Sequence, residues 1–232
     1  DRLYLKANYI TIERCKANAI EMGGYNINAQ HATIRQCYVE RIDGQGYASN
    51  LSAYATIENC IIVGDYYGNT HGIEGLLYAT IRNNYIRKPI DREVLYHIEN
   101  STITNNVIIN KNTSTKLFDG VSGVTNQISN NILSCAEDTY STIPNNKFLN
   151  SNDESLVFAL QGSNDQLYQL KDGSPAKGYA TDGSDCGPYG GATPYVPGGL
   201  PKGYPYYTKA GVSSRAANGK VNVSLNIQLQ DE

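Results

Sequence analysis

The feature that most constrains this 232-residue chain is an internal repeat of 22 to 25 residues. Each unit begins with a small residue, a Thr and an apolar anchor, and a bend and a second apolar pair follow. The anchor residues are Ile12, Ile34, Ile57, Ile81, Ile103 and Ile128, with a shorter echo at Ile143. A short alternating segment that runs into a turn is typical of a strand, and the Gly- and Asn-rich segments between units disfavour helix. The repeat therefore predicts a solenoid of stacked strands.

Stacking in register places equivalent positions in columns about 4.8 Å apart. Three residues after the anchor, the column reads Cys15, Cys37, Cys60, Asn84, Asn106, Asn131 and Asn146. Asn can bond the backbone of the next rung, and Cys is a small buried substitute, so we expect stacked thiols here and no disulfides. One residue after the anchor, Glu13, Arg35, Glu58 and Arg82 alternate in sign. Opposite charges on adjacent strands favour parallel, in-register stacking with this column facing outward.

A leucine-rich repeat is the alternative architecture, because its 20- to 29-residue unit also places Asn or Cys three residues after an apolar anchor. Its earlier leucine should lie five residues before the anchor, where this chain has Ala7, Ala29, Ser52, Leu76, Ile98 and Gly123. Its convex side would also need apolar helix-like spacing, which the Gly- and Asn-rich segments lack. The predicted fold is therefore all-β: a single-stranded right-handed parallel β-helix solenoid of about seven rungs. Its handedness follows from the general preference of parallel connections.

The repeat fades after Phe148, where the composition shifts to Gly, Pro and Tyr. We expect β-helix rungs over residues 1–150, a last irregular coil and wrap over 151–200, and a β-hairpin cap with an Asn-Gly turn over 201–232. Residues 170–176 read Leu-x-x-Gly-Ser-Pro-Ala, and residues 185–195 read Asp-x-Gly-x-Tyr-Gly-Gly-x-x-Pro-Tyr.

With these two elements and the rung motif, most of residues 9–195 resembles secreted right-handed parallel β-helix, pectate-lyase-like repeat proteins of Bacteroidetes-like bacteria. The function of most of these proteins is unknown. The resemblance implies a bacterial protein exported to the periplasm, the cell surface or the medium. It implies a scaffold and not an activity, since one fold hosts many functions.

Charge and hydropathy exclude two classes of partner. The formal net charge of -3 provides no basic field for a phosphate backbone, so we expect no nucleic acid partner. No run approaches the roughly 18 apolar residues of a membrane-spanning helix, so we expect no transmembrane segment. We expect a monomer whose partner is a polysaccharide.

Polysaccharide binding along the side of the solenoid is the first functional hypothesis, because Tyr rings stack on sugar rings and Tyr hydroxyls bond them. Three residues before the anchor, Tyr9, His31, Tyr54 and Tyr78 form a column that predicts an exposed aromatic stripe. The same rings would also stabilise the sheet without binding anything. The candidate binding residues are Tyr54, Tyr66, Tyr67, Tyr78, Tyr96 and Arg41.

A polysaccharide lyase or glycoside hydrolase acting on an acidic glycan is the alternative. A uronate lyase needs a cation beside the substrate carboxylate and a base for the proton. The candidate catalytic residues are Asp65, His71, Glu74, Asp91 and Arg92, and the candidate calcium ligands are Asp43, Asp65 and Asp91. His71 lies in a Thr-His-Gly segment that faintly resembles the Gly-His-Gly of polygalacturonases, but the accompanying carboxylate motifs are missing. We expect no cofactor, with calcium if the protein is a lyase. A structural or adhesive surface protein is the third hypothesis.

Overall fold

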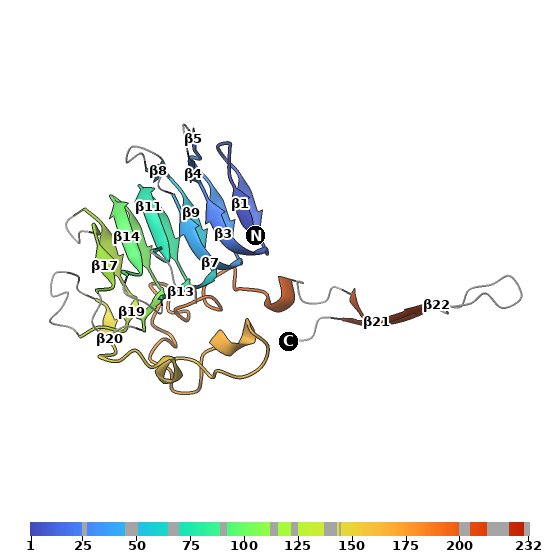
Figure 1. Cartoon of the computed structure of the whole chain (residues 1–232). Helices are drawn as coiled ribbons and strands as arrows, with labels where there is room; N and C mark the ends of the chain where they lie inside the picture. The colour runs from blue at the N-terminus through green and yellow to red at the C-terminus, as the bar shows by residue number, and fades with distance from the viewer. Residues whose placement is uncertain are drawn as a thin grey trace, which may run out of the picture. The chain divides into compact units, whose positions relative to one another are not determined.

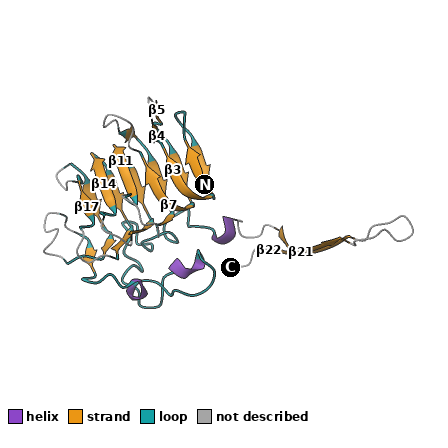
Figure 2. Ribbon diagram, viewed as in Figure 1, coloured by secondary structure: helices purple, strands orange, loops and turns teal. Residues whose placement is uncertain are grey.

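The computed structural model describes residues 1–24, 27–44, 51–64, 70–88, 92–111, 116–121, 125–136, 143, 145–199, 205–212 and 223–229. The chain divides into two compact units, Asp1–Tyr195 and Val196–Glu232. Unit 1 is a β-solenoid of about four complete turns, built from parallel strands that stack side by side (Figure 1). Within the described ranges the only helical segments are short 3-10 turns, against the leucine-rich alternative (Figure 2).

The Thr-Ile segments of the repeat form one parallel sheet of six strands. They are β2 (Thr11–Glu13), β6 (Thr33–Arg35), β9 (Thr56–Glu58), β12 (Thr80–Arg82), β15 (Thr102–Thr104) and β18 (Gln127–Ser129). Each anchor isoleucine pairs with the anchor of the next rung, as Ile34 does with Ile57, and those of the middle rungs are fully buried. The predicted register is confirmed, because it places every anchor in one apolar core.

The outward charge column of this sheet is also confirmed. Arg35 contacts Glu13 at 2.8 Å and Arg82 contacts Glu58 at 2.6 Å. The Arg35 and Glu13 side chains are 37% and 27% exposed, so this pair contributes well under about 1 kcal/mol to stability, whereas the Arg82 pair is partly buried because the Glu58 side chain is only 9% exposed. The Arg35 pair therefore reports the register more than it stabilises the fold.

A second parallel sheet of twelve strands closes the solenoid. They are β1 (Arg2–Tyr4), β3 (Lys16–Glu21), β7 (Tyr38–Asp43), β8 (Ser52–Ala53), β10 (Ile61–Val63), β11 (Ile73–Leu77), β13 (Tyr85–Lys88), β14 (Leu95–Glu99), β16 (Val107–Asn110), β17 (Phe118–Asp119), β19 (Ile132–Leu133) and β20 (Lys147–Phe148). A short antiparallel pair, β4 (Gly23–Gly24) and β5 (Ile27–Asn28), accompanies it. Strand β20 pairs with β19, but Thr142 of the seventh unit lies outside the described residues, so the seven-rung count stays a prediction.

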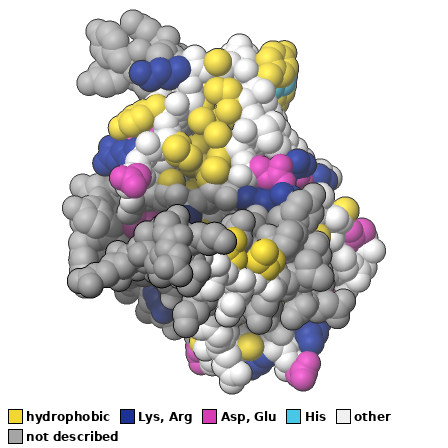
Figure 3. Space-filling view, turned by 90° about the vertical axis from the view of Figure 1, so that its right-hand side faces the viewer, with side chains coloured by type: hydrophobic (Ala, Val, Ile, Leu, Met, Phe, Trp, Pro, Cys, Tyr) yellow, Lys and Arg dark blue, Asp and Glu magenta, His cyan; other side chains and the backbone are white. Residues whose placement is uncertain are grey.

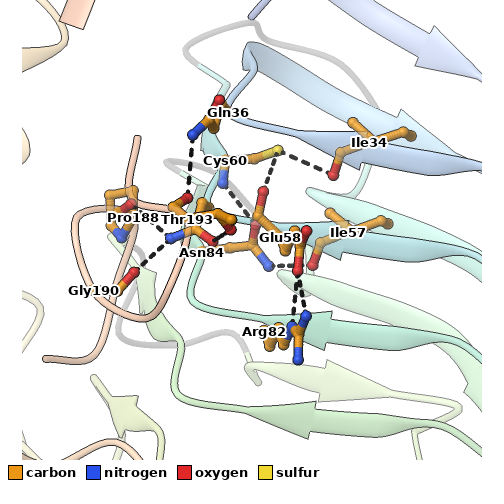
Figure 4. Close-up of polar contacts among 11 residues, drawn as sticks. Ile34, Gln36, Ile57, Glu58, Cys60, Arg82, Asn84, Pro188, Gly190 and Thr193 are labelled. Atoms are coloured by element: carbon orange, nitrogen blue, oxygen red, sulfur yellow. Dashed lines mark hydrogen bonds and ion pairs between the residues drawn. The ribbon is translucent and has the colours of Figure 1, made fainter. Parts of the chain in front are cut away.

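An amide ladder runs through the inner turn, as the column three residues after the anchor predicts. Asn84 and Asn106 each donate a side-chain N–H to the amide oxygen of the next Asn at 3.0 Å, and that oxygen also accepts their backbone N–H at 2.9 Å. The backbone N–H of Cys60 donates to Asn84, and its thiol donates to the Glu58 carbonyl (Figure 4). Cys15, Cys37 and Cys60 form no disulfide bonds, as expected for the stacked thiols.

The C-terminal part of unit 1 packs against the outside of the second sheet. It contains the 3-10 turns η3 (Glu154–Leu156) and η4 (Gln166–Tyr168), and Val157, Phe158 and Tyr168 form an apolar cluster with Ile61 and Tyr85 of the solenoid. Glu154 is buried and accepts from Tyr85 Oη and from Arg87 Nη1 at 3.1 Å. This cluster covers the outer face of the second sheet over strands β10 and β13.

Residues 179–194, which we call the strap, cross the rungs in reverse order. The strap's backbone carbonyls accept side-chain N–H groups from the column two residues after the anchor. Gln36 donates to Thr193 and Pro194 at 3.3 and 2.6 Å. Asn59 donates to Pro188 and Gly190 at 3.0 and 2.7 Å, and Figure 4 shows Gln36, Thr193, Pro188 and Gly190 together. Asn83 and Asn130 likewise donate to Asp185 and Tyr179. These column residues have positive φ, which turns their amides outward.

Several apolar side chains at the first rung are only partly buried, although Ile20 and Met22 of the same rung are fully buried. Leu3, Ile10 and Ile12 pack against the core from its edge, and a band of hydrophobic side chains is visible from this side of the molecule (Figure 3). Unit 2 contains the 3-10 turn η5 (Pro197–Gly199) and two antiparallel strands, β21 (Pro205–Val212) and β22 (Val223–Leu229). The expected Asn-Gly turn between them lies outside the described residues.

Candidate functional site

The candidate site lies where the second sheet divides into two arms. Strand β7 is continuous, yet it pairs with β10 through Tyr38 and Val39 and with β11 through Ile42 and Asp43. Arg41 lies between the two pairings, at the fork. We call the group around it the fork site, which consists of Glu21, Arg41, Asp43, His71, Glu74, Lys88 and Tyr96.

The register aligns a row of outward side chains across the strands of one arm. In order across the sheet, the row is Tyr4, Glu21, Asp43, Glu74, Tyr96 and Asp119. Three adjacent acids on strands about 4.8 Å apart repel one another. Arg41 offsets this repulsion: its guanidinium contacts Glu21 at 2.6 Å, Asp43 at 3.2 Å and Glu74 at 4.0 Å.

His71 lies beside Glu74 of the acidic row, and Glu93 and Tyr96 fix the orientation of its ring. Its Nδ1 is 3.0 Å from the carbonyl oxygen of Glu93, and its ring stacks on Tyr96 with centroids 4.2 Å apart. A carbonyl only accepts, so Nδ1 carries the proton, and Nε2, which is 3.9 Å from Glu74 Oε2, presents a lone pair. Burial lowers the pKa of His71; the hydrogen bond and the charge of Glu93 act in the other direction, and the charges of Arg92 and Lys88 act with burial, so the net shift is downward. The neutral imidazole is therefore favoured at neutral pH.

Glu74 has the opposite perturbation. Burial raises its pKa to about 7, and the adjacent Asp43 carboxylate raises it as well, while Arg41 and Lys88 act in the other direction. The Glu74 side chain is 13% exposed, so desolvation of its charged form is the main cause. A carboxyl group with this pKa exists in both protonation states at neutral pH, which suits an acid or a base in catalysis.

A polar cavity adjoins the fork site. Its volume is about 260 Å³, and Arg2, Asn18, Glu40, Arg41, Thr70 and Lys88 lie along its wall. Lys88 Nζ donates to Thr70 Oγ1 at 2.9 Å, and Asn18 Nδ2 donates to Glu40 Oε1 at 2.7 Å. These contacts hold hydrogen-bond donors and acceptors in place along the wall. The cavity therefore suits a ligand rich in hydroxyl groups, which both donate and accept.

Several of the residues that the sequence nominates come together here. The structure places Arg41, Asp43, Glu74, His71 and Tyr96 in one group, and the charge of Arg92 acts on His71. Asp65, Tyr66, Tyr67 and Asp91 lie outside the described residues. Sequence reasoning missed Tyr4, Glu21 and Glu40. Glu21 carries a usable signal, because it precedes Asp43 by 22 residues, one repeat.

The predicted aromatic column is confirmed as a stack. The ring centroids of Tyr9, His31, Tyr54 and Tyr78 are 4.6, 4.8 and 5.3 Å apart in order, with interplanar angles of 4° to 17°. Each inner ring thus has both faces covered by its neighbours. Tyr54 presents an edge and a hydroxyl to solvent, and the broad faces that stack on sugars are occupied.

The role of Asp43 as a calcium ligand stays a prediction. Its carboxylate and those of Glu21 and Glu74 contact the Arg41 guanidinium. In the described part of the chain, no three His, Cys, Asp or Glu residues are grouped as metal ligands.

Comparisons of the chain with protein-family models, with curated proteins and with solved structures give no match. Among the described residues, no helix has the length and apolar character needed to span a membrane.

Proposed function

We propose that this protein binds a polysaccharide across the strands of one arm, at the fork site. The observation that carries the proposal is the polar cavity of about 260 Å³ beside a row of outward side chains in which Tyr4 and Tyr96 flank three acids. Tyr4 is 55% exposed, and Tyr96 lies on the other side of the acids. Aromatic rings that flank hydrogen-bonding side chains are typical of carbohydrate sites.

The proposed binding face is the fork site and not the stacked column that runs from Tyr9 to Tyr78. Tyr54 has both ring faces covered by its neighbours, and Tyr78 has one face covered, whereas the row at the fork site offers charged side chains that bond vicinal hydroxyls. A sugar chain lying across parallel strands would meet one outward side chain at each step of about 4.8 Å.

Affinity electrophoresis against neutral and acidic polysaccharides tests the proposal. We expect retardation by at least one polymer, and Tyr4→Ala should weaken binding about tenfold because it removes an exposed ring worth roughly 1 kcal/mol or more. Tyr54→Ala is the matched control on the stacked column and should bind like the unmodified protein. Loss of binding in Tyr54→Ala alone would move the site to that column, and no retardation by any polymer would reject polysaccharide binding.

We further propose that the protein is an exported bacterial monomer, and that its solenoid is right-handed with seven rungs and a C-terminal wrap. Its resemblance to secreted β-helix proteins supports export. Burial of Cys37 and Cys60, which are fully inaccessible, would protect these thiols from an oxidising compartment. Fractionation of the source cells tests export, and light scattering tests the monomer.

A further inference from the structure

We propose that Glu74 is the proton donor for hydrolysis of a glycosidic bond at the fork site, with Asp43 accepting a proton from water and His71 positioning Glu74. This inference rests on the proposed function, because the substrate is the polysaccharide bound there. It adds an activity to what would otherwise be a binding surface.

The geometry brings two carboxyl groups and a neutral base into one place. Asp43 and Glu74 are register partners on the adjacent strands β7 and β11. One oxygen of each lies within 4.0 Å of the same nitrogen, Arg41 Nη1. In glycoside hydrolases whose base activates water directly, the two carboxyl groups that flank the scissile bond stand roughly 6.5 to 9.5 Å apart. Arg41 and Lys88 also line the adjacent cavity, so a sugar held there would approach this pair.

The groups that face Glu74 come from two strands and one loop. Asp43 on β7 favours its protonated form, and Arg41 on β7 and Lys88 on β13 favour its ionised form. His71, from the segment before β11, points an unprotonated Nε2 at Glu74, since its Nδ1 is engaged by the Glu93 carbonyl. Burial outweighs the cations, so Glu74 holds a proton that it can release at neutral pH.

The step balances with water as the only co-reactant. Glu74 gives its proton to the bridging oxygen as the bond from that oxygen to the anomeric carbon breaks, and the electron pair of the bond stays on the oxygen. The oxygen of a water molecule donates an electron pair to the anomeric carbon, and the Asp43 carboxylate takes the proton that this water loses. Transfer of that proton back to Glu74 restores both groups.

The test uses the full chain and the polysaccharide that retards it in electrophoresis, with new reducing ends and unsaturated uronate absorbance followed together. We expect reducing ends without absorbance, at a rate that falls as the pH rises through about 7. Glu74→Gln should still bind the polymer and should lose at least about 100-fold in rate. Glu99→Gln, which removes a 45% exposed carboxylate elsewhere on β14, is the control and should keep the full rate.

The pH dependence of the rate in His71→Ala distinguishes a positioning role for His71 from a purely structural one, which would leave that dependence unchanged. Opening Glu74 to water should lower its pKa, so the alkaline limb of the rate profile should shift to lower pH. Binding with no reducing ends from the unmodified protein would overturn the activity and leave polysaccharide binding intact. Absorbance in place of simple reducing ends would replace hydrolysis by elimination. Absence of binding to every polymer would remove both proposals.

Discussion

Glu74 links the chemistry of the fork site to the stability of unit 1. Its folded-state pKa of about 7 exceeds the ordinary value of 4.5, so the folded chain binds more protons than the unfolded chain between these pH values. Stability therefore falls as the pH rises from about 4.5 to about 7 and changes no further above that range. We expect Glu74→Gln to be more stable than the unmodified chain at pH 8 by on the order of 2 kcal/mol, with no gain at pH 4.

Urea unfolding of both proteins from pH 4 to pH 8 measures this difference. Glu99→Gln again serves as the control, since its carboxylate is 45% exposed and stays solvated. A stability difference between Glu74→Gln and the unmodified chain that is the same at every pH would contradict the raised pKa.

His71 should respond in the opposite direction at the same site. Burial lowers its pKa below the ordinary 6.5, so the folded chain resists protonating this ring. The stability that the neutral ring contributes is present above about pH 6.5 and is lost as the pH falls toward the lowered pKa. Replacement by Gln, which cannot titrate, should therefore remove part of the acid-induced loss. The measurement is the unfolding midpoint of His71→Gln and of the unmodified chain at pH 7 and pH 5.

Among the elements, the amide ladder joins successive rungs through groups that have no access to water. Asn106 is fully buried; its amide N–H groups donate to the Ile81 and Thr104 carbonyls and to Asn131, and its oxygen accepts from Asn84. Asn106→Ala would strand several of these partners, at roughly 1 to 3 kcal/mol for each buried group left unpaired. Asn106→Cys should cost less, because a thiol can still donate to a carbonyl, as Cys60 does.

Chemical denaturation of the two Asn106 variants ranks them. Equal losses for Asn106→Ala and Asn106→Cys would show that the thiol makes no useful bond in this column. A loss below about 1 kcal/mol for both would contradict a structural role for the ladder itself.

The elements that sequence predicts well are those tied to the anchor by a constant offset. The Asn and Cys column, the Glu/Arg column and the Tyr9-to-Tyr78 stack all keep a fixed distance from the isoleucine, so their alignment follows directly from the repeat. The fork site does not have this property. Asp43 pairs with Glu74, which follows 31 residues later, because an extra segment separates the two units at this point. No 22- to 25-residue alignment places these two acids side by side.

The contacts of the strap cannot be predicted from the repeat either. Its carbonyl groups accept from Gln36, Asn59 and Asn83, but a backbone carbonyl carries no sequence signature, and the contacts join residues more than 100 positions apart. The Asn residues two positions after the anchor indicate only a turn, since Asn tolerates positive φ. What those amides face could be learned only from the folded chain.

At the scale of the whole molecule, the strap makes the rungs of unit 1 depend on one another. A simple solenoid is stabilised by contacts between neighbouring repeats, so its ends can open while its centre stays folded. Here residues 179–194 bond the second through sixth units, from Gln36 to Asn130, and the apolar cluster beneath them contains Ile61, Val107 and Ile132. Opening any one of these rungs therefore also breaks strap contacts.

Asn59→Gly tests this coupling without introducing backbone strain, because Asn59 has a φ of 51° that glycine adopts freely. The change removes three hydrogen bonds to the strap, at Pro188, Gly190 and Thr193. We expect faster amide exchange and easier proteolysis in residues 179–194, with unfolding that spreads over a wider denaturant range. Asn145→Gly, at the same left-handed position with a φ of 61° and with no strap contact among the described residues, should leave the strap protected. Equal exchange in the two variants would mean that the strap is held by its apolar contacts alone, and that the amide column contributes only the shape of the turn.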